Sequence, residues 1–233
     1  MAEESINSAF DILYEDNHLI AVNKRAGEIT QGDCTGDTPL PEKVKAYLKE
    51  KYHKPGNVYL GVVHRLDRPV SGIVIFAKTS KALSRMNEQF REDRVKKVYH
   101  AIVEQSPKQP SATLQNWLLK NQKQNKSYIV PEGTKGAKKA VLDYSTIGHS
   151  DRYTLLEVAL KTGRHHQIRV QLGSVGAVIR GDLKYGAKRS LPNGSISLHA
   201  RAVSFIHPVT KDVIEITAPY PKDDALWAFF ESI

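Results

Sequence analysis

A short polar segment between two apolar runs restricts the fold of this chain more than any other feature of its sequence. The apolar runs cover residues 58–63 and 72–77, and residues 64–71 lie between them. Short apolar runs bounded by polar residues are typical of strands. The sequence therefore predicts two strands joined by a polar loop, and it places the chemically reactive side chains in that loop.

The remaining apolar patterns predict more strands than helices. Strands are expected as a hairpin at 11–23, at 97–103, 140–147 and 153–160, and as a second hairpin at 198–221. Helices are expected at 38–51, from an N-cap at Ser80 with Leu83, Met86 and Phe90 facing the core, and from 162 to 176. Because strands and helices do not alternate regularly, the chain is expected to be α+β, with a mixed, largely antiparallel sheet flanked by helices and loops.

The length of 233 residues suits one main domain, expected over residues 11–233 after an N-terminal tail at 1–10. Residues 120–139 are rich in lysine and amide side chains, and are either an arm that faces RNA or a loop kept polar for solubility. The single cysteine, Cys34, has no partner for an internal disulfide.

The net positive charge of the chain favours binding to polyanions. Lysine and arginine number 34 against 25 acidic residues, a formal charge of +9, so RNA, DNA and anionic membranes are all possible partners, as is simple solubility. No leader sequence and no apolar segment of about 18 residues is present, which predicts a cytoplasmic protein without a membrane partner.

Asp67 is the candidate reactive residue of the polar loop. Arg65 and Arg68 flank it, and a carboxylate held beside arginine stays ionised and can act as a nucleophile or a base. A structural turn with a surface ion pair at His64 and Asp67 explains the same residues. A kinase catalytic loop is disfavoured, because leucine stands between the His-Arg pair and Asp67 and no glycine-rich phosphate loop is present.

A metal site at His165 and His166 is also disfavoured. Neighbouring residues point about 100 degrees apart on a helix and to opposite faces on a strand, so they rarely bind one ion. We expect these histidines to be hydrogen-bonded within the protein or to contact RNA.

Six short segments occur in a specific order along the chain: residues 23–27, 61–72, 97–103, 163–170, 181–186 and 198–200. Together they resemble the RluA-type pseudouridine synthase family over about residues 11–221. The resemblance implies the pseudouridine synthase fold and a catalytic domain at 11–233. We expect that domain to lack the small N-terminal RNA-binding S4 module that many relatives carry.

The resemblance also implies roles for individual residues. Asp67 is expected to be the nucleophile, Tyr99 to stack on the target base, and Arg169 to pair with Asp67. Arg65 is expected to enter the RNA stack when the uridine flips out. His64, Arg164 and Gln167 are expected to contact RNA, although a packing role explains them equally well.

The implied reaction needs no cofactor and no metal, because uridine and pseudouridine contain the same atoms and no electrons are transferred. The implied partner is a ribosomal or transfer RNA, and the protein is expected to be a monomer. Several positions depart from the usual family pattern, including Arg25, His165 and Gln171, and they leave the substrate open. A non-catalytic RNA-binding protein on the same fold and an N-glycosidase that releases uracil are the alternatives.

Overall fold

Residues 10–32 and 36–233 are described in the computed structural model, and they form two compact units. The first unit contains the residues up to Val95 together with Arg201–Pro219, and the second contains Lys96–Ala200 and Tyr220–Ile233. Residues 1–9 of the expected tail, and Cys34, lie outside the described residues. The single domain expected over 11–233 stays a prediction.

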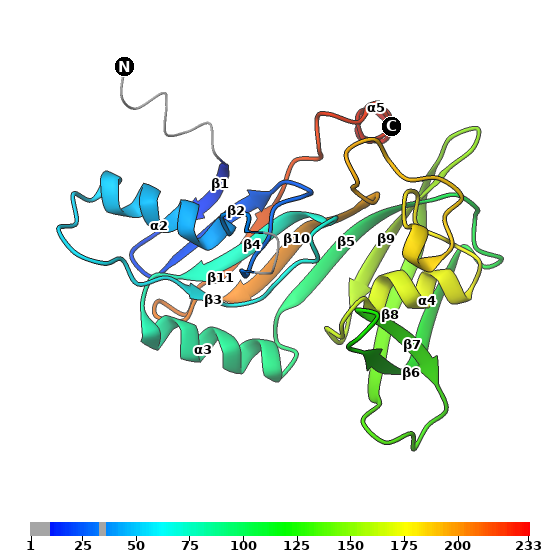
Figure 1. The fold of residues 1–233 in the computed structure, drawn as a ribbon, viewed down its shortest axis with the longest axis horizontal. Helices are drawn as coiled ribbons and strands as arrows, with labels where there is room; N and C mark the ends of the chain where they lie inside the picture. The colour runs from blue at the N-terminus through cyan, green and yellow to red at the C-terminus, as the bar shows by residue number, and fades with distance from the viewer. Residues whose placement is uncertain (1–9, 33–35) are drawn as a thin grey trace. The chain divides into compact units, whose positions relative to one another are not determined.

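The first unit is built on antiparallel strands (Figure 1). The order of its main strands is β1 (Asp11–Glu15), β2 (Leu19–Lys24), β4 (Ser71–Ala77) and β10 (Leu198–Ile206), with β11 (Val213–Thr217) paired to β10 and β3 (Gly61–Val62) paired to β4. Its helices are α2 (Leu40–Lys51) and α3 (Ser80–Arg91). Helix α3 contacts β3 and β4, and the first three residues of β10 belong to the second unit.

The core of the first unit lies between β4 and α3. Every residue of β4 is buried, and its alternate side chains Ile73, Ile75 and Ala77 pack with Ala82 and Met86 of α3. These positions follow from a period of two on the strand and a helical period on α3. The two ends of the loop that carries Asp67 are thus anchored, because β3 precedes it and β4 follows it.

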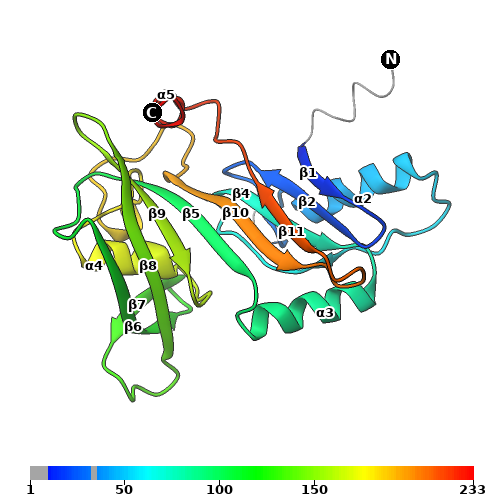
Figure 2. The same ribbon diagram turned by 180° about the vertical axis from the view of Figure 1, so that it is seen from behind.

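The second unit has a sheet in the order β5-β9-β8-β6-β7, again antiparallel. Its strands are β5 (Lys96–Val103), β6 (Ser111–Asn121), β7 (Lys126–Val130), β8 (Lys138–His149) and β9 (Thr154–Leu160), and its helices are α4 (Gln167–Ser174), η1 (Leu183–Tyr185, a 3₁₀ turn) and α5 (Ala225–Glu231). Helix α4 packs against β6 and β7, and its Val170 meets Leu118 of β6 and Ala140 of β8 (Figure 2).

The α+β class with a largely antiparallel sheet is confirmed, as are the hairpins at 11–23 and 198–221 and the helix at 38–51. The strand expected at 58–63 is wrong in length, because only Gly61–Val62 pairs. Residues 120–139 include the end of β6, the turn and β7 of the β6–β7 hairpin, the loop that follows and the start of β8, so they are not a simple loop. Strand β6 and helix α5 were not expected.

Two predicted helix starts are wrong. Thr79, with extended backbone, caps α3, and its Oγ1 accepts a hydrogen bond from the Ala82 amide at 3.1 Å, so Ser80 is the first helical residue. Helix α4 begins at Gln167 rather than at Thr162, because His166 before it has left-handed backbone with φ of 54°. None of the helices in residues 10–32 and 36–233 is long and apolar enough to cross a membrane.

The cap of α3 can be tested with two neighbouring hydroxyl residues. Thr79→Ala removes the acceptor for the Ala82 amide and is expected to lower the free energy of unfolding by about 1 kcal/mol. Ser80→Ala is expected to change it by less than about 0.5 kcal/mol. Urea unfolding of both variants measures the difference, and equal losses would show that Thr79 is not the cap.

Candidate active site

A buried lysine, Lys24, forms hydrogen bonds to the loop that carries Asp67. Lys24 ends β2 with no exposed surface, although lysine is a residue type that is almost never fully buried without partners. Its Nζ donates to the carbonyl oxygens of Arg25 at 2.9 Å, Arg68 at 3.2 Å and Val70 at 2.6 Å. One ammonium group therefore connects the end of β2 to the loop on both sides of residue 69.

Backbone hydrogen bonds complete the attachment of this loop. The Val70 amide donates to the Asp67 carbonyl at 3.0 Å and closes a turn, and the Gly27 amide donates to the Arg68 carbonyl at 2.8 Å. Gly27 has a φ of +91°, which a glycine adopts at little cost. These bonds hold the backbone at Asp67 and at Arg68.

Burial and nearby charges set the protonation of Lys24. Burial lowers the pKa of Lys24 to about 8, while the carboxylates of Glu28 and Asp67 raise it and Arg68 lowers it. The ammonium form thus predominates at neutral pH and places a positive charge near the half-buried Asp67.

His64 and Arg65 lie differently in the same loop. The half-buried His64 ring stacks on Phe90, with centroids 5.0 Å apart and planes 20° apart, and its Nε2 accepts from the Ile75 amide at 3.2 Å. Arg65 is exposed, and its Nη1 donates to the side chain of Gln31. His64 thus helps to pack the first unit, while Arg65 is accessible from solvent.

Arg169 forms a buried, two-pronged ion pair in the second unit. Its Nε lies 2.7 Å from Asp182 Oδ2 and its Nη2 lies 2.8 Å from Asp182 Oδ1, with side chains 6% and 1% exposed. The guanidinium carbon also lies 5.2 Å from the centroid of the Tyr185 ring. A planar guanidinium matched to both carboxylate oxygens is held in one orientation, which a lysine could not reproduce.

Gly181, which precedes Asp182 in the chain, lies where a side chain does not fit. Its φ is +86°, and a Cβ there would lie 2.9 Å from the Ser195 carbonyl oxygen and 2.8 Å from Leu191. The glycine at position 181 therefore has a steric cause.

Tyr185 joins the Arg169 region to strand β7. Its hydroxyl lies 2.9 Å from His166 Nδ1. The same hydroxyl accepts a hydrogen bond from the Ser127 amide at 2.9 Å and donates one to the Ser127 carbonyl at 3.2 Å. His166 stacks on His165 with centroids 3.8 Å apart. Burial and the neighbouring Arg169 lower the pKa of His166 to about 2, so this ring is neutral at physiological pH.

The other predicted residues of the second unit lie on β5 and before α4. Tyr99 is half-buried on β5, opposite Val158. Arg164 is exposed and donates from Nε to the Lys139 carbonyl at 2.9 Å.

Gln167 is buried, and its amide binds atoms of the protein. Its Oε1 accepts from the Arg164 amide at 2.9 Å and from Thr162 Oγ1 at 2.8 Å, and its Nε2 donates to the Val141 carbonyl at 3.1 Å. The nearby Arg169 shares its helix α4 with Gln167, whereas Asp67 belongs to the first unit. The predicted pairing of Arg169 with Asp67 stays a prediction.

Sequence reasoning assigned no role to Lys24, Asp182 or Tyr185. All three lie inside the segments that carried the family resemblance, which was the available signal. A lysine that ends an apolar strand was an additional sign in the case of Lys24. No group of three His, Cys, Asp or Glu side chains that could hold a metal ion is present in residues 10–32 and 36–233.

Comparison with known proteins places these residues in a family context. A family profile described as RNA pseudouridylate synthase matches residues 18–174, which include Asp67, Tyr99 and Arg169. The chain is 34% identical over 217 residues to an uncharacterized RNA pseudouridine synthase of Bacillus subtilis, YhcT, with 91% of this chain and 69% of the relative covered.

Two further proteins are similar. The ribosomal large subunit pseudouridine synthase C of Buchnera aphidicola is 34% identical over 215 residues, with 89% of this chain and 66% of the relative covered. The solved structure of human RNA pseudouridylate synthase domain containing 4 is similar in fold, with a TM-score of 0.80, 21% identity, and 98% of this chain and 94% of that chain covered.

Removing the buried ammonium tests its role in the loop. At pH 7, Lys24→Met leaves three carbonyl groups without their donor and is expected to lower the free energy of unfolding by about 2–4 kcal/mol. Between about pH 7 and 9.5 the difference in free energy of unfolding between the wild type and this variant should grow by about 1–2 kcal/mol. The reason is that Lys24, with a pKa of about 8, loses its proton in the folded protein over this range, whereas the same lysine in the unfolded chain keeps it. Urea unfolding of the wild type and the variant at both pH values measures this difference.

Lys43→Met is the matched control, because Lys43 forms a partly exposed ion pair with Glu28 at 2.8 Å. We expect Lys43→Met to lower the free energy of unfolding at pH 7 by about 1 kcal/mol or less. If the difference in free energy of unfolding between the wild type and Lys24→Met were the same at both pH values, the lowered pKa of Lys24 would be contradicted.

The ion pair of Arg169 and Asp182 can be tested in the same way. Asp182→Asn leaves a buried guanidinium without its carboxylate and is expected to lower the free energy of unfolding by about 3–5 kcal/mol. Asp143→Asn breaks an exposed pair with Lys161 and should cost less than about 1 kcal/mol. Thermal or urea unfolding checks both, and similar small losses would show that the buried pair is not structurally required.

Proposed function

Because the chain belongs to the RNA pseudouridylate synthase family, we propose that it isomerises specific uridines of a ribosomal or transfer RNA to pseudouridine, with Asp67 as the nucleophile. The observation that supports Asp67 is the construction of its loop. The ammonium of Lys24 and the turn at Val70 hold the backbone around a single carboxylate. A carboxylate fixed in this way is suited to attack or stabilise an anomeric carbon.

The reaction conserves every atom of the nucleotide. The bond between N1 of uracil and C1′ of the ribose breaks, the base turns, and C5 bonds to C1′ while the C5 proton moves to N1. Asp67 would act at C1′ in this sequence. Members of the family are isomerases, and no electron donor or acceptor enters the balance.

The target base must leave its stack before Asp67 can reach C1′, at a cost of a few kcal/mol. We assign stacking on the extruded base to Tyr99 and insertion into the emptied position to Arg65, whose exposure suits that role. Arg169 would keep the Asp67 carboxylate ionised, and its bond to Asp182 would orient the guanidinium.

The expected RNA contacts of His64, Arg164 and Gln167 stay predictions. The exposure of Arg164 favours such a contact, whereas the stacked His64 and the internally bonded Gln167 favour a packing role. The cytoplasmic location, the monomeric state and the absence of a cofactor are likewise expectations from the sequence.

The nucleophile is tested by Asp67→Ala. This variant is expected to lose pseudouridine formation by at least about a thousandfold, because removing a covalent nucleophile eliminates the chemical step. A chemical map of pseudouridine across cellular RNA, with and without the protein, identifies the substrate, and the purified variant is then assayed on that RNA.

Asp143→Asn, an exposed carboxylate, should retain wild-type activity, and Asp67→Ala should still bind RNA. Wild-type rates in Asp67→Ala would exclude Asp67 as nucleophile. Free uracil among the products would indicate an N-glycosidase, and RNA binding without any new pseudouridine would indicate a non-catalytic protein.

A further inference from the structure

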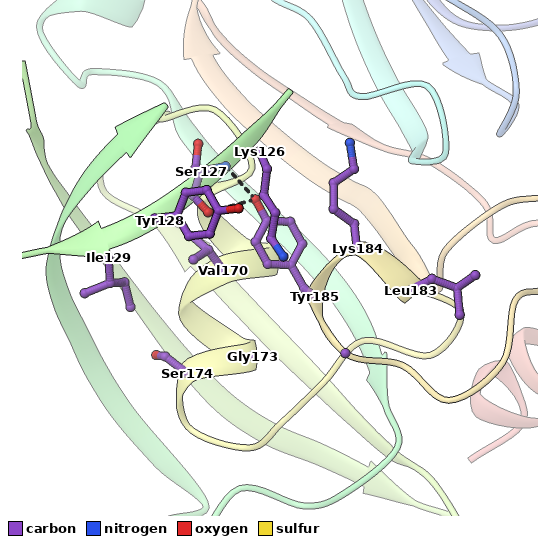
Figure 3. Close-up of a pocket in the computed structure, with 11 residues that line it drawn as sticks. Lys126, Ser127, Tyr128, Ile129, Val170, Gly173, Ser174, Leu183, Lys184 and Tyr185 are labelled. Carbon is purple, nitrogen blue, oxygen red and sulfur yellow. Dashed lines mark hydrogen bonds between the residues drawn. The ribbon is translucent and has the colours of Figure 1, made fainter. Parts of the chain in front are cut away.

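The second unit has a surface cleft of about 530 Å³ that none of the residues assigned to catalysis lines. Strand β7 lies on one side of it, η1 on the other, and helix α4 between them (Figure 3). The residues that line it are Lys126, Ser127, Tyr128, Ile129, Val170, Gly173, Ser174, Leu183, Lys184, Tyr185 and Gly186. A volume of this size is typical of sites that bind small molecules or single groups of a larger ligand.

The lining combines positive charge with aromatic and apolar surface. Two lysines line the cleft, and no acidic residue is among the eleven. The Nζ of Lys126 lies 5.4 Å from the ring centroid of Tyr128 and 5.1 Å from that of Tyr185. Tyr128 is 39% exposed and Leu183 is 57% exposed, which are large values for residues of these types.

Exposed aromatic rings beside lysines are the combination that binds single-stranded nucleic acid. The ring offers a stacking surface to any base, and the ammonium groups pair with the phosphates. Two exposed lysines, Lys184 and Lys120, add positive charge nearby, since after burial and Arg169 both help to lower the pKa of His166. An anionic ligand is therefore favoured over a neutral or cationic one.

We propose that this cleft binds one nucleotide of single-stranded RNA other than the target uridine, with its base stacked on Tyr128 and its phosphate held by Lys126 and Lys184. The proposal rests on the proposed function, since it takes the substrate of the enzyme to be RNA. It assigns a function to the basic segment 120–139, whose β6–β7 hairpin supplies one wall of the cleft.

The cleft is connected to the Arg169 region through Tyr185. The ring of Tyr185 lines the cleft and lies 5.2 Å from the guanidinium carbon of Arg169, and its hydroxyl binds His166 and Ser127. A nucleotide bound there would contact the same tyrosine that packs against Arg169.

An acidic peptide could use the same lysines. The two tyrosine rings favour a nucleotide, because planar bases gain more from stacking than acidic side chains do. The two ligand classes are separated by experiment.

Binding is measured by fluorescence anisotropy with a fluorescein-labelled oligouridylate of about twelve nucleotides, the length range of single-stranded binding sites. Tyr128→Ala is expected to raise the Kd at least about fivefold, and Tyr128→Phe to leave it within about twofold, because phenylalanine retains the ring. Lys126→Gln combined with Lys184→Gln should reduce the slope of log Kd against log salt by about 0.7, the value for one phosphate contact on a single strand.

The charge-matched control combines Lys49→Gln with Lys81→Gln, two exposed lysines of the first unit. It should leave the salt slope unchanged. Unchanged binding by Tyr128→Ala, or an equal loss of slope in this control, would overturn the proposal. Displacement of the RNA by an oligoglutamate peptide at similar concentrations would also overturn it and assign the cleft to acidic peptides.

Two further measurements separate the binding result from a failure to fold and from a failure of catalysis. If Tyr128→Ala fails to fold, the combined Lys126→Gln and Lys184→Gln variant gives the same test through its salt slope, which should fall by about 0.7. All variants are also measured in the Asp67→Ala background. A wild type that makes no pseudouridine would refute the proposed function, whereas the effect of Tyr128→Ala on RNA binding decides the cleft.

Discussion

The first unit depends on one buried ammonium group. The segment that carries Asp67 has no regular secondary structure, so the strands around it do not satisfy its carbonyl groups. From the end of β2, Lys24 supplies two of the missing hydrogen bonds, to Arg68 and Val70, and donates a third to the neighbouring Arg25. Burial of this ammonium lowers its pKa to about 8. Buried carbonyls need a donor, and one lysine provides it to both sides of the turn. The rigidity of the loop, and with it the position of the carboxylate, follows from this arrangement.

The second unit solves a similar problem with a guanidinium. Arg169 is buried because Asp182 neutralises it and occupies two of its donor positions, while Tyr185 covers it with an aromatic face. The hydroxyl of Tyr185 extends the same network to Ser127 on β7. A strand of the basic hairpin is thereby linked to a helix that carries a residue of the family motif. The hairpin is for this reason a part of the folded unit and not an appended polar loop.

Local patterns predicted most of the elements that have a strong periodicity. The hairpin β1–β2, helix α2, strand β5 and the core position of Met86 follow from apolar spacing alone. Helix starts were less predictable, because Thr79 and Ser80 both carry a hydroxyl group and only the extended backbone of Thr79 makes it the cap. Strand β6 was missed because most of its side chains are half-buried or exposed, which leaves little apolar signal.

The sequence by itself determined the family and the candidate nucleophile, since both are read from the order of short motifs along the chain. It also determined that Asp67 lies between two strands, because apolar runs specify strands locally. Only the tertiary structure decided which groups meet: Lys24 with carbonyls 44 and 46 residues away, Arg169 with Asp182, and the cleft between β7, α4 and η1. The reason is that a buried polar group bonds to whatever folding brings beside it, and the spacing of residues along a chain does not specify that neighbour.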